Sequence, residues 1–304
     1  MHGYLYIAAA GAFWALSATL GKLAFTGRLI PGTALPPLDA VILSQARTTI
    51  SLLVLAPVLL IQGGRSAFAM PRRQIVRCLI LGTLGVAASN FFYYFAISKT
   101  AVSIAIIVQY TAPVWVLLYM VARRLQAPTA SRVLAVLLAL LGITMAIGIL
   151  GKRNVRVSWV GVTAAFGAAF GFAFYNVFGR RLVTTYSRGQ VLLYALLGSA
   201  LFWSAINPPW KIVAMHYSGY QWLFLLVFAF VSMLIPFSFY LSGLHHLDAT
   251  RAVVTSCLEP VFTVVMATLF LGESLSMLQT LGIAIVIVAT VVIQLPETQV
   301  AAAA

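Results

Sequence analysis

One carboxylate lies inside a long apolar stretch of the chain. The 304 residues include only five acidic ones. One of them, Glu259, belongs to the apolar segment LEPVFTVVMATLFLGE, residues 258–273. A carboxylate in apolar surroundings is costly unless it is paired or hydrogen-bonded. Such a group can bind an amine or a proton, or accept hydrogen bonds from backbone near Pro260, whose ring interrupts helical bonding. Glu259 therefore indicates a substrate or proton site, with a structural bond as the alternative.

Polar and aromatic residues recur at spacings that suit a cavity for an amphipathic molecule. Asn90 precedes Tyr93 and Tyr94 by three and four residues, so one helix face can present amide and ring together. Rings suit the side chain of an amino acid, and amide and hydroxyl groups suit its amine and carboxylate. Helix packing or a place at a membrane interface is the alternative for each ring. The predicted substrate-binding residues are Trp14, Ser17, Asn90, Tyr93, Tyr94, Tyr110, Tyr175, Asn176 and Glu259.

Other residues in apolar runs predict bends and packing. Pro113 and Pro260 each remove a helical N–H donor, so we expect kinks that line the cavity, serve gating or only adjust packing. Arg47 lies well inside an apolar run, and we expect a structural role for it. Its guanidinium can pair with a carboxylate, reach the outer interface or contact headgroups. Gly142 and Gly282 are expected to permit close helix packing.

The elements that position these residues follow from composition. The chain is 62% hydrophobic and 8% charged, with a mean hydropathy of +1.03. Apolar runs of about 20 residues are typical of transmembrane helices, whereas barrel strands show alternating segments of about 10 residues. We predict an all-α integral membrane protein of ten transmembrane helices. They lie near residues 3–25, 38–62, 74–97, 101–123, 130–150, 156–179, 189–207, 219–244, 249–271 and 275–295.

The charge of the chain bears on partners and on orientation. The formal charge is +14, but the basic residues are spread over short connections, so we predict no nucleic acid partner. With the N-terminus inside, the inner connections hold eleven Lys and Arg residues and the outer ones seven. This bias predicts that both termini are cytoplasmic, although the GKRNVR connection counts against it. Cys78 and Cys257 are expected to be buried, with no disulfide or metal role.

The two halves of the sequence resemble each other. The segment from Gly3 to Lys22 aligns with that from Gly161 to Arg180, and Pro113 aligns with Pro260. Five helices in each half is an odd number, so the second half crosses the membrane in the opposite orientation. Secondary transporters are commonly built from such inverted repeats, with the substrate site between the halves. We predict a 5+5 inverted repeat over residues 1–152 and 153–304, with chance similarity between apolar helices as the alternative.

Several motifs carry a resemblance to a known superfamily. They are AAAGAFWALSATLGK, AISKTAVSIAIIVQYTAPVWVLL and GLHHLDATRAVVTSCLEPVFTVVMATLFLGES. The chain resembles the drug/metabolite transporter superfamily, in particular its ten-helix EamA-type members, and is similar to bacterial aromatic amino acid exporters. The resemblance implies a central cavity lined by helices 1, 3, 4, 6, 8 and 9, and export of metabolites or amino acids across a bacterial inner membrane.

We therefore expect a secondary transporter or facilitator that exports amino acids, aromatic ones included, or related small metabolites by alternating access. Its expected partners are a small-molecule substrate and membrane lipid, with proton coupling left open. No nucleotide-binding loop, nucleophile elbow or metal-ligand spacing is present, so we predict no enzyme activity, cofactor or metal. A multidrug or nucleotide-sugar carrier of the same superfamily is the alternative. A channel, which favours a ring of like groups along a straight pore, is a more distant one.

Overall fold

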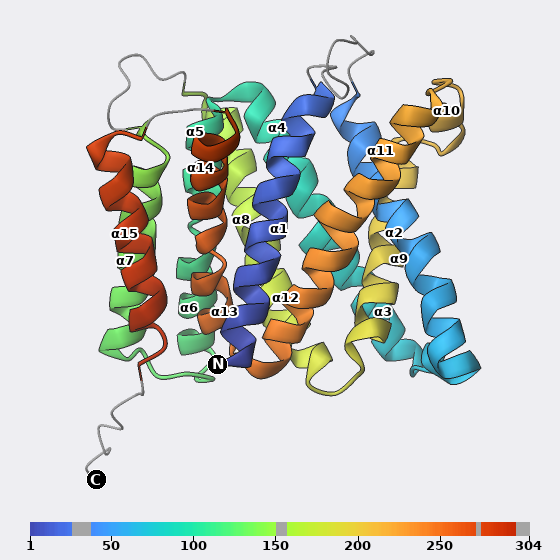
Figure 1. Ribbon diagram of the computed structural model, residues 1–304. Coiled ribbons are helices and arrows are strands. Elements are labelled where there is room, and N and C mark those ends of the chain that lie inside the picture. Colours follow the sequence, from blue (N-terminus) through green and yellow to red (C-terminus); the bar gives the residue numbers. More distant parts are fainter. Residues whose placement is uncertain (26–37, 150–156, 272–274, 296–304) are drawn as a thin grey trace.

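The computed structural model describes residues 1–25, 38–149, 157–271 and 275–295, and all regular structure within these ranges is helical (Figure 1). Within these ranges, seven helical segments are long and apolar enough to cross a membrane: Ala40–Phe68, Arg72–Lys99, Val102–Ala122, Trp159–Val183, Arg188–Ile206, Gly219–His246 and Ala249–Met266. Two shorter apolar helices, Ala130–Ala146 and Met277–Val292, lie beside them. The predicted all-α membrane fold is thus confirmed, while the count of ten spans stays a prediction.

The predicted runs and the observed helices agree to within about one helical turn. The elements in chain order are α1 (His2–Phe25), α2 (Ala40–Gly63), η1 (Gly64–Phe68), α3 (Arg72–Ile80), η2 (Leu81–Ala88), α4 (Ser89–Lys99), α5 (Val102–Gln109), α6 (Ala112–Ala122), α7 (Ala130–Ala146), α8 (Trp159–Val183), α9 (Arg188–Ile206), α10 (Trp210–Val213), α11 (Gly219–Ala229), η4 (Phe230–Leu234), α12 (Ile235–His246), α13 (Ala249–Thr255), α14 (Leu258–Leu271) and α15 (Met277–Val292).

Local sequence explains where several helices begin. The Asp39 side chain accepts hydrogen bonds from the backbone N–H groups of Val41 and Ile42, at 2.8 and 3.2 Å, and so caps α2. Ser218 at the start of α11 and Ser276 at the start of α15 each form a capping box with the glutamine three residues later. These bonds satisfy N–H groups that the first turn leaves free.

Four of the long segments are interrupted inside the bundle. A π-helical stretch, η2, separates α3 from α4, and a second one, η4, separates α11 from α12. The α-helix stops altogether between α5 and α6, and again between α13 and α14. Pro113 and Pro260 lie in the first turn of α6 and α14. The predicted kinks are therefore breaks, which lie just before each proline.

Close packing between helices depends on small residues. An added Cβ at Gly142 in α7 would lie 2.9 Å from the carbonyl oxygen of Gly282 in α15, and the reverse approach would be 2.7 Å. Figure 1 shows these two helices side by side at one edge of the bundle. The packing role predicted for both glycines is thus confirmed. Elsewhere, α1 packs along α12 and α8 packs along η2 and α4, and these contacts surround the centre of the protein.

Candidate functional site

Two of the interrupted segments, α5–α6 and α13–α14, meet through Tyr110 and Glu259. We call these two segments the broken helices. Tyr110 directly follows α5, and Glu259 is the second residue of α14. The Tyr110 hydroxyl lies next to the Glu259 carboxylate, in the position of a hydrogen-bond donor. The two breaks therefore face each other, and both place a polar side chain where the regular helix is interrupted.

Helix α1 runs against this meeting point. A Cβ added at Gly11 would lie 3.4 Å from the backbone nitrogen of Glu259, so α1 is in direct contact with the start of α14. Tyr93 from α4 is an electrostatic neighbour of the same carboxylate. Glu259 is half-buried in these surroundings. A carboxylate placed between four helices, with two tyrosines beside it, can bind an amine or exchange a proton.

An aromatic group continues from this carboxylate towards α8 and α12. The Trp14 ring lies 5.2 Å from Tyr240, 5.3 Å from Phe237 and 6.4 Å from Phe172, measured between ring centroids. Tyr240 donates its hydroxyl hydrogen to Oδ1 of Asn176 at 2.7 Å, and both side chains are fully buried. The structure therefore brings Trp14 and Asn176, both predicted from sequence, into one group of side chains.

We call this group the central cluster. It draws residues from α1, α4, α8, α12 and both broken helices, which are the helices that the family resemblance implies around a cavity. Its members are Trp14, Tyr93, Tyr110, Phe172, Tyr175, Asn176, Phe237, Tyr240 and Glu259.

Two predicted residues make no polar contact across the cluster. The Ser17 hydroxyl donates to the carbonyl oxygen of Trp14 at 2.8 Å, within its own helix. Tyr175 is 1% exposed, its ring lies 6.0 Å from Tyr240, and its buried hydroxyl has no hydrogen-bond partner. Neither hydroxyl therefore joins two helices of the cluster.

Asn90 lies beside the cluster and bonds to Arg47, a contact that the sequence did not predict. Arg47 is 7% exposed, and its Nη2 donates to Oδ1 of Asn90 at 3.0 Å, while the Asn90 amide nitrogen donates to the carbonyl oxygen of Val86 at 2.7 Å. The acceptor is thus an amide and not one of the three alternatives that the sequence offered, and the structural role expected for Arg47 stays a prediction. The residue is buried between α2 and α4, where an amide oxygen is the acceptor within reach. Nε of Arg47 has no hydrogen-bond partner.

Tyr94 faces a different space from its neighbour Tyr93. It lines a cavity of about 210 Å³ between α2, α4 and α9, together with Ala40, Val41, Phe91, Phe95 and Trp203. The substrate-binding roles predicted for Asn90 and Tyr94 stay predictions, because the structure holds no ligand.

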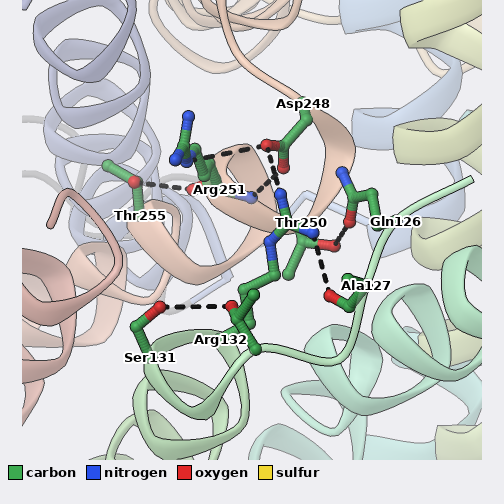
Figure 2. A network of polar contacts seen from close by, with 9 residues as sticks. Gln126, Ala127, Ser131, Arg132, Asp248, Thr250, Arg251 and Thr255 are labelled. Carbon is green, nitrogen blue, oxygen red and sulfur yellow. Dashed lines mark hydrogen bonds and ion pairs between the residues drawn. The ribbon is translucent and has the colours of Figure 1, made fainter. Parts of the chain in front are cut away.

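A second polar group ties the start of α13 to the first half of the chain (Figure 2). The Asp248 carboxylate lies 3.6 Å from Nη2 of Arg132 and 3.6 Å from Nε of Arg251, and it accepts a 2.8 Å bond from the Arg251 backbone N–H. Thr250 donates its hydroxyl hydrogen to Oε1 of Gln126 at 2.8 Å. We call these five residues the Asp248 network. It connects α13 with the α6–α7 connection and with the start of α7.

Sequence reasoning missed Tyr240, although a signal for it was present. The residue lies in α12, part of the eighth predicted helix, which the family resemblance already placed at the cavity. Among the residues that the structure describes, no three His, Cys, Asp or Glu side chains gather as metal ligands do. Cys78 and Cys257 are free and buried, as the sequence predicted.

Comparison with known proteins gives a family match. A profile of the EamA-like transporter family matches residues 1–148 and again residues 159–295. A solved crystal structure of another protein superposes with a TM-score of 0.74 at 19% sequence identity, over 96% of each chain. This likeness shows the fold alone.

Two kinds of curated relative are similar over most of their length. The chain is 23% identical to the uncharacterized inner membrane transporter YicL of Salmonella typhimurium, over 77% of each protein. It is 24% identical to the threonine/homoserine exporter RhtA of Escherichia coli K12, over 70% of this chain and 69% of the relative. RhtA of Salmonella typhimurium LT2 is 25% identical over the same shares.

Proposed function

Because the chain belongs to the EamA-like transporter family, we propose that it exports amino acids or related small metabolites across a bacterial inner membrane. Membership makes it a multi-pass membrane transporter and not an enzyme, as the sequence predicted. The name of RhtA supports an amino acid as the substrate, and that of YicL supports the inner membrane. Threonine and homoserine have small hydroxylated side chains, so these relatives favour such substrates over the aromatic ones.

One observation carries the proposal, namely the contact between Glu259 and Tyr110 at the two helix breaks. Discontinuous helices near the middle of a membrane expose backbone groups and side chains to a substrate, and secondary transporters use them as binding sites. The Glu259 carboxylate can bind the amine of an amino acid. The unpartnered hydroxyl of Tyr175 and the rings of the central cluster can contact the rest of the molecule.

We further propose that residues 1–152 and 153–304 are inverted repeats, although the boundary itself lies outside the described residues. The spacing of Pro113 and Pro260 maps the π-helical η2 onto residues 228–235, which contain η4. The same spacing maps the first helix break onto the second to within a residue. The family profile matches once in each half. Two related halves that meet around one site suit alternating access by rocking.

The basic residues support a cytoplasmic N-terminus. The start of α3, the end of α6 and the α8–α9 connection lie at the end of the bundle that holds the N-terminus in Figure 1. An excess of Arg and Lys is typical of cytoplasmic connections. The arginines at this end are Arg65, Arg72, Arg73, Arg77, Arg123, Arg124, Arg132, Arg180, Arg181, Arg188 and Arg251.

Uptake into proteoliposomes tests the transport proposal. Labelled threonine, homoserine and phenylalanine are supplied to the purified protein without an ion gradient, and then with a pH gradient. Saturable uptake that is accelerated by the same amino acid inside the vesicle supports a carrier. Uptake confined to the pH gradient adds proton coupling. No uptake of any of the three under both conditions refutes the amino acid assignment, and a rate that never saturates favours a channel.

A further inference from the structure

A cavity lies outside the bundle at its arginine-rich end. Its volume is about 360 Å³, and it lies between α3 and the last turns of α8. Both apolar side chains and two arginines line it. The residues on which the inference rests are Arg77, Ile80, Phe174, Phe178, Arg181 and Leu182.

This cavity faces away from the central cluster. Asn176 lies on the side of α8 away from Arg181 and is fully buried in the core, whereas Arg181 is exposed. On α3, Val76 and Ile80 are 52% and 43% exposed although both are apolar. Exposed apolar residues on a membrane helix are those that lipid covers. The cavity therefore opens towards lipid at one end of the membrane span.

Both arginines are held in place by neutral groups. The Arg181 guanidinium lies over the Phe178 ring at 5.4 Å, and its Nη2 donates to the Tyr119 hydroxyl at 3.5 Å. Nη1 of Arg77 donates to Oε1 of Gln74 at 3.1 Å. The ion pairs found within the described residues go to Asp248 and involve Arg132 and Arg251. Two positive charges thus line one cavity without a carboxylate between them.

We propose that this cavity binds an anionic phospholipid, with the phosphate group between Arg77 and Arg181. Guanidinium groups bind phosphate oxygens through paired hydrogen bonds, and a basic recess at the membrane surface attracts anionic lipid. Ile80, Phe174, Phe178 and Leu182 then contact the acyl chains. A phosphatidylcholine headgroup carries its own cation next to its phosphate, so two arginines select a headgroup with net negative charge. The inference does not depend on the identity of the transported substrate.

Thermal unfolding of the full chain in neutral detergent tests this proposal, with native mass spectrometry to count bound lipid. The additives are phosphatidylglycerol, phosphatidylcholine and inorganic phosphate, each over a concentration series. We expect phosphatidylglycerol to raise the unfolding temperature and to remain bound, with phosphatidylcholine much weaker. The double variant R77Q/R181Q should bind phosphatidylglycerol about 30-fold more weakly. The matched control R72Q/R73Q removes two arginines of the same end that do not line the cavity, and it should bind like the original chain.

Three results would overturn the proposal. Equal stabilisation by the two lipids would remove the charge selectivity, and equal weakening in both double variants would remove the assignment to this cavity. The same shift with inorganic phosphate at equal concentration would indicate a site for free anions instead of a lipid. If R77Q/R181Q cannot be purified, the single variants R77Q and R181Q provide the comparison, each expected about 5-fold weaker.

Discussion

The buried Arg47–Asn90 contact predicts strong coupling between two positions that sequence placed in different roles. The bond of 3.0 Å joins a guanidinium that is 7% exposed to the amide of a second helix. Asn90→Leu removes the acceptor and leaves a buried charge without it, whereas Arg47→Met removes the charge and leaves only a neutral amide. The double variant Arg47→Met/Asn90→Leu replaces both partners by apolar groups of similar size.

The magnitudes follow from what each change leaves buried. Loss of a hydrogen bond to a charged group costs about 1.5–3 kcal/mol, so we expect Asn90→Leu to lower the unfolding free energy by about 3 kcal/mol. Arg47→Met should cost about 1 kcal/mol, because an unsatisfied amide is cheaper to bury than an unsatisfied charge. The double variant should cost about 1 kcal/mol or less, since replacement of both partners is close to neutral. The resulting coupling energy is about 3 kcal/mol.

Unfolding of the four proteins by titration with denaturing detergent, followed by circular dichroism, measures this cycle. Ser44→Ala on the same helix is the control, because its buried hydroxyl has no hydrogen-bond partner and its loss should cost little. Neutral hydrogen bonds between membrane helices average about 0.6 kcal/mol in such cycles. A coupling energy at or below that value would refute the view that Asn90 serves chiefly to satisfy the charge of Arg47.

Three further predictions test the site and its surroundings. Glu259→Gln should abolish the response to a pH gradient if the carboxylate carries protons, or raise the KM for amino acids under every gradient if it binds their amine; unchanged transport at normal stability would contradict both. Tyr240→Phe should lower the unfolding free energy by about 1 kcal/mol, because it breaks a fully buried hydrogen bond. Tyr175→Phe removes a hydroxyl without a hydrogen-bond partner and should leave the unfolding free energy unchanged. Equal losses in the two variants would argue against the bond between Tyr240 and Asn176. Asp248→Asn keeps an acceptor for the cap of α13 and should cost less than Asp248→Ala by about 1 kcal/mol in the same titration.

The helices could be predicted because hydropathy and length determine them almost without reference to tertiary structure. Each apolar run is long enough to be recognised as a helix from the sequence alone. Pro113 and Pro260 also predicted two of the four interruptions, those between α5 and α6 and between α13 and α14. Pro236 in the first turn of α12 follows η4 but was not used as a signal, whereas η2 gave no comparable signal. The sequence of η2, LGTLGVAA, contains no proline.

The sequence predicted part of the candidate site, because it identified polar and aromatic residues on helices but not which helices pack together. Trp14, Tyr93, Tyr110, Asn176 and Glu259 meet in the central cluster.

The part of the site that the sequence did not predict consists of contacts between different helices. Arg47 finds its acceptor on α4, and Tyr240 finds Asn176 on α8. Hydropathy does not say which helices lie next to each other, so neither bond could be derived from spacing along the chain. The number of spans and the substrate contacts stay predictions.

The close pair of α7 and α15 has a consequence for biogenesis. Each is the last described helix of its half, and α15 emerges from the ribosome long after α7 has entered the membrane. Until then the glycine face of α7 around Gly142 lacks the α15 backbone that packs against it in the folded chain. We expect a half-synthesised or truncated chain to display this seam to membrane proteases. Packing of α15 against α7 then covers this face.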